Sequence, residues 1–228
     1  ACAGFPRVSA DWILGPGLDA VTLLEELTEA VDLGVEHVSL YILELHPGTD
    51  LARRVAAGEL QLAPDAETEA LYLGCVEHLA RLGLAQYEIS NFARPGAECR
   101  HNLRYWHNEP YLGLGPAAAG FLNEVRYKNV ADTAAYVAAI RAGRSPRAEE
   151  ERLPPERRVR ETAMLELRLT SGIDRRRFAA RYKEDPVALF AAAIEPHRAD
   201  GLLVVNETSI RLTRRGLLLA DTVIADFL

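Results

Sequence analysis

Short apolar runs and helical periodicity alternate along the first part of the chain. Val8–Leu14 and His37–Leu45 are rich in β-branched and aromatic residues, and each is followed by a turn containing Gly and Pro, which predicts two strands. Ala85–Ser90 predicts a third strand by its composition.

Two amphipathic helices are predicted between these strands. Apolar residues recur at helical spacing from Leu23 to Val31, and Gly34 ends that helix. A second helix is predicted to begin at Asp65 as its N-cap and to run to Leu82. Its expected buried stripe consists of Leu71, Cys75, Leu79 and Leu82. Strands and helices that alternate in this way indicate βαβ units and a parallel sheet.

The later part of the chain changes to shorter elements. Tyr111–Lys128 predicts a hairpin that turns near Asn123–Glu124, and Ala131–Ala142 predicts a short helix. Ser145–Pro155 is rich in charge and proline and is expected to be a linker. Pro155 suits the first turn of the helix that follows.

The C-terminal region predicts a small helical module with a β-wing. Helices are expected at Ile173–Tyr182 and Pro186–Arg198, and strands at Leu202–Val205 and Ser209–Leu212. Thr213 is expected to cap a final helix. This order resembles a winged helix. We therefore expect two domains, at residues 1–130 and 131–228.

Charge and composition narrow the possible partners. The chain of 228 residues carries a net charge of −7, and the turn of the predicted wing, Val205–Ser209, has no arginine, so nucleic-acid binding is not expected. No apolar run is long enough to span a bilayer and no secretory signal is visible, which predicts a cytoplasmic protein.

The three cysteines, Cys2, Cys75 and Cys99, form neither a disulfide framework nor a CxxC pair. Cys75 is expected to be a core thiol. Cys99 lies close to His101, which leaves a metal ligand open as an interpretation, although an ordinary loop thiol is favoured because no second pair with ligand spacing follows.

Polar residues gather where the predicted strands end. Their shared position predicts a site at the carboxyl edge of the sheet, although each could also serve as a cap or a loop contact. They are Asp11 inside the first strand, Glu44 and His46 at the end of the second, and Glu88, Ser90 and Asn91 at the end of the third.

His101–Trp106 (HNLRYW) places an imidazole, a carboxamide and two large aromatic rings within one short segment. Such a cluster can bind a flat aromatic ligand or a metal centre. The alternative is a loop held by buried aromatic rings with one hydrogen-bonded histidine.

Six ordered blocks resemble a known family. They are Ser9–Gly17, His37–Tyr41, Pro47–Thr49, Gln86–Pro95, His101–Trp106 and Tyr111–Gly115. Together they resemble the oxygen-independent coproporphyrinogen III oxidase-like radical S-adenosylmethionine proteins, and in particular the haem chaperone branch, whose signature is HNxxYW.

The resemblance implies an α/β fold, the later part of a partial (β/α)6 barrel followed by a small winged-helix-like α+β module. It implies S-adenosylmethionine, a four-iron four-sulfur cluster and haem as cofactors, and a haem-accepting protein as partner. By similarity, Asp11, Glu44 and Ala119 line the S-adenosylmethionine pocket. His101 matches the histidine proposed as the haem iron ligand.

Asn102, Tyr105 and Trp106 complete the haem motif in this resemblance. A haem edge against the two aromatic rings would gain from stacking and apolar burial.

The chain also departs from the family pattern. The CxxxCxxC segment that binds the cluster is absent, so the chain is expected to be the C-terminal part of a longer protein. The usual GLPGQT reads Gly15-Pro-Gly-Leu-Asp19, and the usual GLGxGAH ends at Ala119 without its histidine.

Two alternatives to the haem chaperone remain open at this point. One is an oxidase that decarboxylates coproporphyrinogen III through a 5′-deoxyadenosyl radical, chemistry for which this chain has no cluster ligands. The other is a truncated α/β domain without cofactor activity.

Overall fold

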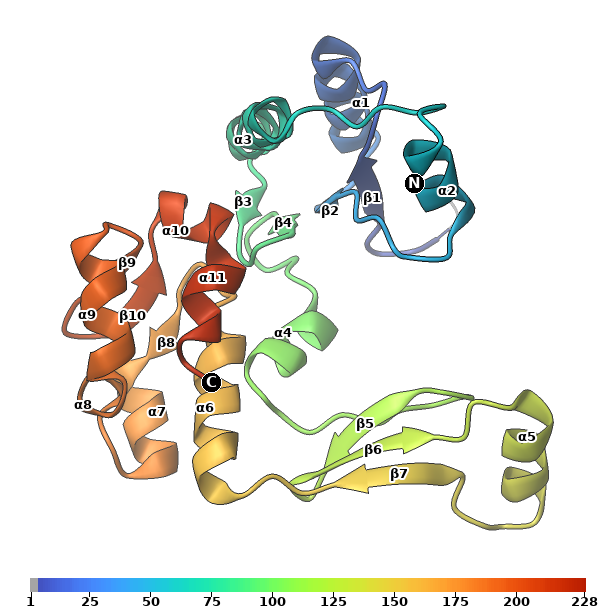
Figure 1. Cartoon of the computed structure of the whole chain (residues 1–228), viewed down its shortest axis with the longest axis vertical. Coiled ribbons are helices and arrows are strands. Elements are labelled where there is room, and N and C mark those ends of the chain that lie inside the picture. Colours follow the sequence, from blue (N-terminus) through green and yellow to red (C-terminus); the bar gives the residue numbers. More distant parts are fainter. Residues whose placement is uncertain (1–3) are drawn as a thin grey trace. The chain divides into compact units, whose positions relative to one another are not determined.

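The computed structural model describes residues 4–228 and divides the chain into two compact units, Ala1–Cys99 and Arg100–Leu228 (Figure 1). The predicted domain boundary at residue 130 falls inside the second unit and stays a prediction. Cys2 lies outside the described residues. Within residues 4–228, no helix is both long enough and apolar enough to cross a membrane.

The first unit contains four short strands and three helices in its described part. They are β1 (Ser9–Leu14), α1 (Ala20–Asp32), β2 (His37–Ile42), α2 (Asp50–Ala56), α3 (Asp65–Arg81), β3 (Ala85–Gln86) and β4 (Asn91–Ala93). The strands form one sheet in the order β1-β2-β4-β3.

The first two strands pair in parallel as predicted, with Asp11 opposite Ser39, but the third predicted strand is wrong. Residues 85–93 form two strands, β3 and β4, and β4 is antiparallel to both β2 and β3. The physical reason is the turn between them. The Glu88 carboxylate accepts hydrogen bonds from the Ser90 amide and from the Asn91 side chain, which reverses the chain.

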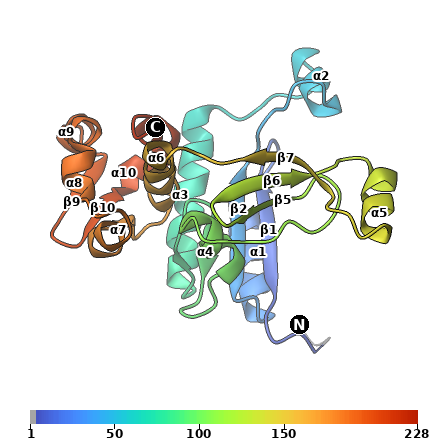
Figure 2. The same ribbon diagram turned by 90° about the horizontal axis from the view of Figure 1, so that it is seen from below.

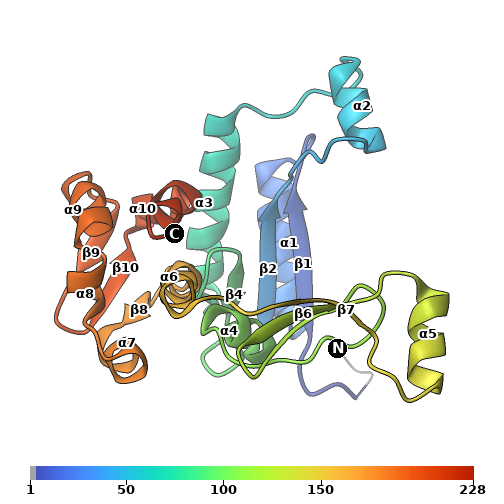
Figure 3. The same cartoon turned by 60° about the horizontal axis from the view of Figure 1, so that its bottom comes forward.

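The core of the first unit lies between the sheet and the apolar stripes of α1 and α3 (Figure 3). Its buried side chains include Leu23, Leu27, Val38, Leu40, Cys75, Leu79 and Phe92. Cys75 is confirmed as a core thiol, and burial raises its pKa to about 11. Leu71 and Leu82 are only half-buried.

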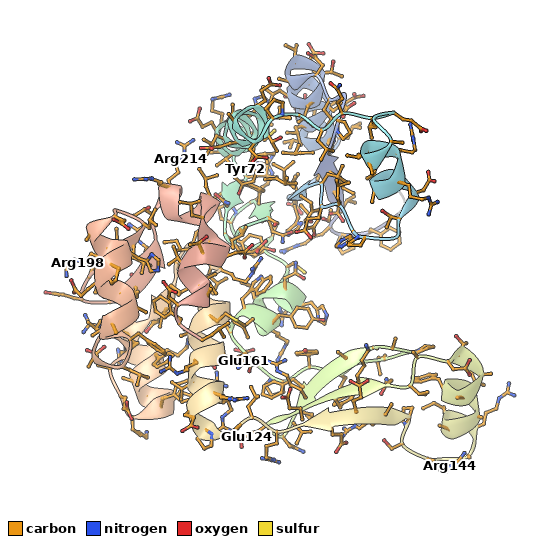
Figure 4. All side chains as sticks on the ribbon, viewed as in Figure 1. Tyr72, Glu124, Arg144, Glu161, Arg198 and Arg214 are labelled. Carbon is orange, nitrogen blue, oxygen red and sulfur yellow. The ribbon has the colours of Figure 1, made fainter. Side chains whose placement is uncertain are left out.

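Two details of α3 differ from the prediction. The position before the helix is Pro64, so Asp65 is not the N-cap but contributes a first-turn carboxylate. Tyr72 takes the buried position expected for Leu71, and its hydroxyl donates to the Ile89 carbonyl across 2.7 Å (Figure 4).

The second unit begins with the helix that carries the HNLRYW segment. Its first half contains α4 (Arg100–Trp106), β5 (Ala119–Leu122), β6 (Val125–Asn129), α5 (Thr133–Arg141) and β7 (Arg147–Glu151). Its second half contains α6 (Pro155–Glu166), β8 (Ile173–Asp174), α7 (Arg175–Tyr182), α8 (Pro186–Leu189), α9 (Ala191–Ala199), β9 (Leu203–Val205), β10 (Ser209–Leu212), α10 (Arg214–Leu218) and α11 (Ala220–Ala225).

Strands β5, β6 and β7 form an antiparallel sheet that connects to α5 (Figure 2). The predicted hairpin is confirmed, and its turn has positive φ angles at Asn123 and Glu124. The predicted linker is wrong, because it contains β7. All five β7 residues are exposed, so the strand lacks apolar alternation. Arg147 covers the Tyr127 ring at 4.0 Å and attaches this edge strand to its neighbour.

The winged-helix-like module has the predicted strands β9 and β10 and a third strand, β8, in the order β8-β10-β9. The helix expected from Ile173 begins two residues later, because Asp174 is its N-cap and Ile173 pairs with Ile210. Thr213 caps the final helical region as predicted. That region breaks at Leu219 into two short helices.

Candidate functional site

His101 and Tyr105 lie four residues apart on α4 and therefore share one face of the helix. His101 Nε2 lies 2.6 Å from the Tyr105 hydroxyl, and the two rings meet edge to face with centroids 4.7 Å apart. The His101 ring is exposed, while Tyr105 is half-buried. The helix thus presents an imidazole whose orientation is held by a phenol.

Tyr105 continues into a supported aromatic stack. Its ring meets Tyr111 edge to face, with centroids 4.5 Å apart. Tyr111 exchanges two backbone hydrogen bonds with Phe121 of β5, at 2.8 and 2.9 Å. Its position is therefore fixed by main-chain pairing, which in turn limits the movement of Tyr105.

A charged group supports the same stack from the other side. Arg126 on β6 donates to the Tyr111 hydroxyl at 3.4 Å, to Asn108 Oδ1 at 2.9 Å and to Glu161 on α6 at 2.8 Å. Figure 4 labels Glu161 on its helix. Asn108, which is buried, also donates to Glu161 and to Thr162. This network connects the end of α4 to α6.

The other face of the motif is formed by Asn102 and Trp106, which are both half-buried. The guanidinium of Arg168 covers the Trp106 ring at 4.9 Å. Within residues 4–228, the indole Nε1 of Trp106 is buried without a hydrogen-bond partner. The four motif residues predicted from sequence therefore lie on one short helix, with only His101 exposed.

The predicted polar edge of the first unit is assembled in a different way. Asp11 lies opposite Ser39, and Ser39 lies opposite Asn91, so the three residues form a row across three strands. The prediction placed Asn91 at the carboxyl end of a parallel strand, which is wrong. Asn91 is the first residue of β4, which runs antiparallel to β2. Asp11 is exposed, whereas Asn91 and Glu88 are buried at 3% and 1% exposure.

The remaining predicted residues are dispersed. Glu44 and His46 are exposed in the loop after β2, and His46 Nε2 lies 3.9 Å from Glu44 Oε2. Ala119 is exposed at the start of β5 and belongs to the second unit. A shared pocket of Asp11, Glu44 and Ala119 stays a prediction.

His37 is a titratable residue that the sequence analysis did not single out. Its ring nitrogens lie 2.8 Å from Ser9 Oγ and 2.9 Å from the Tyr87 hydroxyl. Burial lowers the pKa of His37, and the charge of Asp11 partly opposes this. No spacing in the sequence signals this contact, because Tyr87 follows fifty residues later.

No group of three or more His, Cys, Asp or Glu side chains that could hold a metal ion is found among the described residues. Cys99 is half-buried, and its backbone amide donates to the Tyr87 hydroxyl. His101 belongs to no such group in the part of the chain that the structure describes.

A solved structure and a family model show which class of protein this fold resembles. The fold matches the structure of coproporphyrinogen III oxidase (HemN) from Escherichia coli, described as a radical SAM enzyme, with a TM-score of 0.77. The match covers 98% of this chain and 55% of the other, at 18% sequence identity, so it speaks for the fold alone. Residues 153–219 match the HemN C-terminal domain.

Proteins with similar sequences show which branch of this class the chain resembles in sequence. The protein named heme chaperone HemW from Mycobacterium tuberculosis (strain H37Rv) is 39% identical over 227 residues, and the one from Bacillus subtilis (strain 168) is 33% identical over 226. Each match covers 99% of this chain, which spans 56% and 60% of the two relatives. The chain is thus similar to the HemN and HemW proteins, and the part that matches a family model is the HemN C-terminal domain, at residues 153–219.

Proposed function

We propose that this chain is the haem-binding part of a haem chaperone and that His101 is the protein ligand of the haem iron. The proposal rests on its similarity to the two relatives named heme chaperone. The choice of His101 as the ligand rests on one observation. His101 is an exposed imidazole held by Tyr105 at the end of an aromatic stack.

The residues present suit a haem. An imidazole nitrogen is a common axial ligand of haem iron, and the iron supplies the coordination bond that retains the group. Metal-bound histidines usually have their second nitrogen hydrogen-bonded, which fixes the ring orientation. Tyr105 provides such a bond to His101. Tyr105 would contact the haem beside the ligand, whereas Asn102 and Trp106, on the other face of the helix, are proposed as haem-binding residues by resemblance to the family.

Radical SAM chemistry is a separate part of the proposal. Asp11, Glu44 and Ala119 are proposed to contact S-adenosylmethionine, by resemblance to the family. The described cysteines do not fit the cluster, because Cys75 is a core thiol of α3 and Cys99 lies in a loop elsewhere.

The chaperone is favoured over the oxidase. The oxidase resembles this chain in its fold, at 18% sequence identity, whereas four relatives named heme chaperone are 32 to 39% identical over 99% of the chain. A chaperone has to release its haem, and an exposed ligand such as His101 suits release better than a buried one. We propose a haem-accepting protein as the partner.

A haem titration followed by visible absorbance tests the proposal. We expect saturable binding with a shifted Soret band, and loss of that shift in His101→Ala. His46→Ala is the matched control, since His46 is also exposed. Unchanged affinity and spectrum in His101→Ala would remove the assignment of the ligand. No saturable binding by the wild-type chain would remove the haem-binding function of this part.

A further inference from the structure

A small cavity bordered by several charged side chains lies in the second unit where the chain leaves α4 and meets α6 and α7. Its volume is about 220 Å³. The side chains that matter for its chemistry are His107, Glu166, Arg177, Arg181 and Tyr182. None of them belongs to the proposed haem motif.

Glu166 is the buried acceptor of this cavity. The residue is 2% exposed, and its Oε1 accepts a hydrogen bond of 2.8 Å from Arg177. Its Oε2 is buried and has no hydrogen-bond partner among residues 4–228. Buried carboxylate oxygens are normally hydrogen-bonded, so this atom points to a missing donor.

Other residues that line the cavity supply donors. Arg177 Nη2 donates to His107 Nδ1 at 2.8 Å, so the proton of the neutral His107 ring is on Nε2. All hydrogen bonds recorded for the Arg177 side chain in the described part involve Nη2, which leaves Nε and Nη1 to donate. Arg181 donates to the carbonyls of His107 and Asn108, both at 3.1 Å, and so holds the end of α4 in place.

We propose that this cavity binds a small oxyanion, with hydrogenphosphate as the simplest example, and that one proton lies between the anion and Glu166 Oε2. The anionic oxygens accept from Arg177 and from His107 Nε2. The shared proton satisfies the carboxylate oxygen that is otherwise unpaired. Guanidinium groups are well suited to such anions, because their planar donors match oxyanion geometry.

The shared proton follows from the charges around Glu166. Arg177, Arg181 and Asp174 act on it from α7 and its N-cap, and His107 and Glu109 line the cavity from the segment after α4. A fully deprotonated anion would face the Glu166 carboxylate, so binding requires a proton on one of the two. Burial raises the pKa of Glu166 to about 7, against the opposing effect of Arg177, and Glu166 can therefore carry that proton near neutral pH.

Sulfate and inorganic phosphate are the probes, titrated calorimetrically into the chain at pH 6 and pH 8 without haem. Sulfate carries no proton in this pH range, so the proton shared between sulfate and Glu166 Oε2 has to be carried by Glu166. Protonation of Glu166 rises about tenfold from pH 8 to pH 6, and we expect sulfate to bind about tenfold more tightly at pH 6. At pH 8, titrations in two buffers of different ionisation enthalpy should show uptake of about one proton, and at pH 6, where Glu166 is already largely protonated, they should show much less.

Two pairs of variants locate the site. Glu166→Gln supplies a permanent donor, so sulfate should bind with no pH dependence, whereas Glu156→Gln, on the exposed first turn of α6, should behave as wild type. Arg177→Gln should weaken binding about tenfold, as the loss of a charged hydrogen bond does. Arg176→Gln removes an adjacent exposed charge and should have little effect.

Absence of saturable binding of both anions overturns the proposal. Equal losses in Arg176→Gln and Arg177→Gln also overturn it, since they would indicate a general charge effect. An unchanged pH dependence in Glu166→Gln contradicts the shared proton. If Glu166→Gln does not fold, proton uptake by the wild-type chain and the arginine pair still decide the question.

Discussion

His37 and His101 each bind a tyrosine hydroxyl, but their surroundings differ. His37 is 8% exposed and has both ring nitrogens hydrogen-bonded, to Ser9 and Tyr87. His101 is exposed, and within the described residues only its Nε2 has a recorded partner. A histidine with both nitrogens bonded stabilises its unit, whereas one with a single bond is oriented and still able to bind a ligand.

Removing the support of the His101 stack should have the largest effect on stability. Arg126→Ala leaves Glu161, whose side chain is 16% exposed, without its ion-pair partner, which should cost about 3 kcal/mol. Hydrogen exchange should show reduced protection in peptides from residues 100–228 and unchanged protection in peptides from residues 4–99. Arg141→Ala, at the end of α5, is the matched control. Equal protection in both variants would contradict the supporting role of Arg126.

Removing His37 should destabilise the first unit by about 2 kcal/mol, because two hydrogen bonds and a buried ring are lost. Chemical denaturation of His37→Ala beside His46→Ala measures the difference. Haem affinity should be unchanged in both variants. A large loss of haem binding in His37→Ala would mean that the two histidines do not have separate roles.

Removing the hydroxyl that orients His101 should have a smaller effect. Tyr105→Phe keeps the aromatic contact with Tyr111 and should weaken haem binding about fivefold, as the loss of one hydrogen bond does. Tyr136→Phe is the control, because it also removes one hydroxyl bonded in this unit, to the Gly115 amide. The position of the Soret band should change only in Tyr105→Phe. Identical spectra would show that Tyr105 does not orient the ligand.

The smallest expected effect is the pH dependence of the first unit. Burial lowers the pKa of His37 in the folded state, so the unfolded state binds more protons at acid pH. The stabilisation is complete above the ordinary histidine pKa of about 6.5 and is lost as the pH falls below it. Thermal unfolding between pH 8 and pH 5 should show a smaller decline for His37→Gln than for wild type. A steeper decline in the variant would contradict a lowered pKa of His37 in the folded state.

The sequence predicts much of this fold, because apolar spacing reports burial directly. Leu23, Leu27 and Leu79 fill the predicted faces of their helices, and Asn123–Glu124 forms the predicted turn. β7 was missed because an exposed edge strand has no apolar alternation. The reversal at Glu88 was missed because a side-chain hydrogen bond determines it.

The candidate site divides in the same way. The HNLRYW residues could be recognised because they lie within one helix of seven residues. Their support by Tyr111, Arg126 and Glu161 depends on contacts between residues up to 35 positions apart, which no local pattern contains. The oxyanion cavity likewise depends on Glu166 and His107 meeting through Arg177.

The central claim is an iron–nitrogen bond to His101, and pulsed electron paramagnetic resonance of the ferric haem complex observes that bond directly. With histidines labelled with nitrogen-15, the wild-type chain should show a coupling to the labelled nitrogen that is absent in His101→Ala and retained in His46→Ala. A coupling that persists in His101→Ala, or that is absent from the wild-type complex, would contradict the assignment of His101 as the haem ligand.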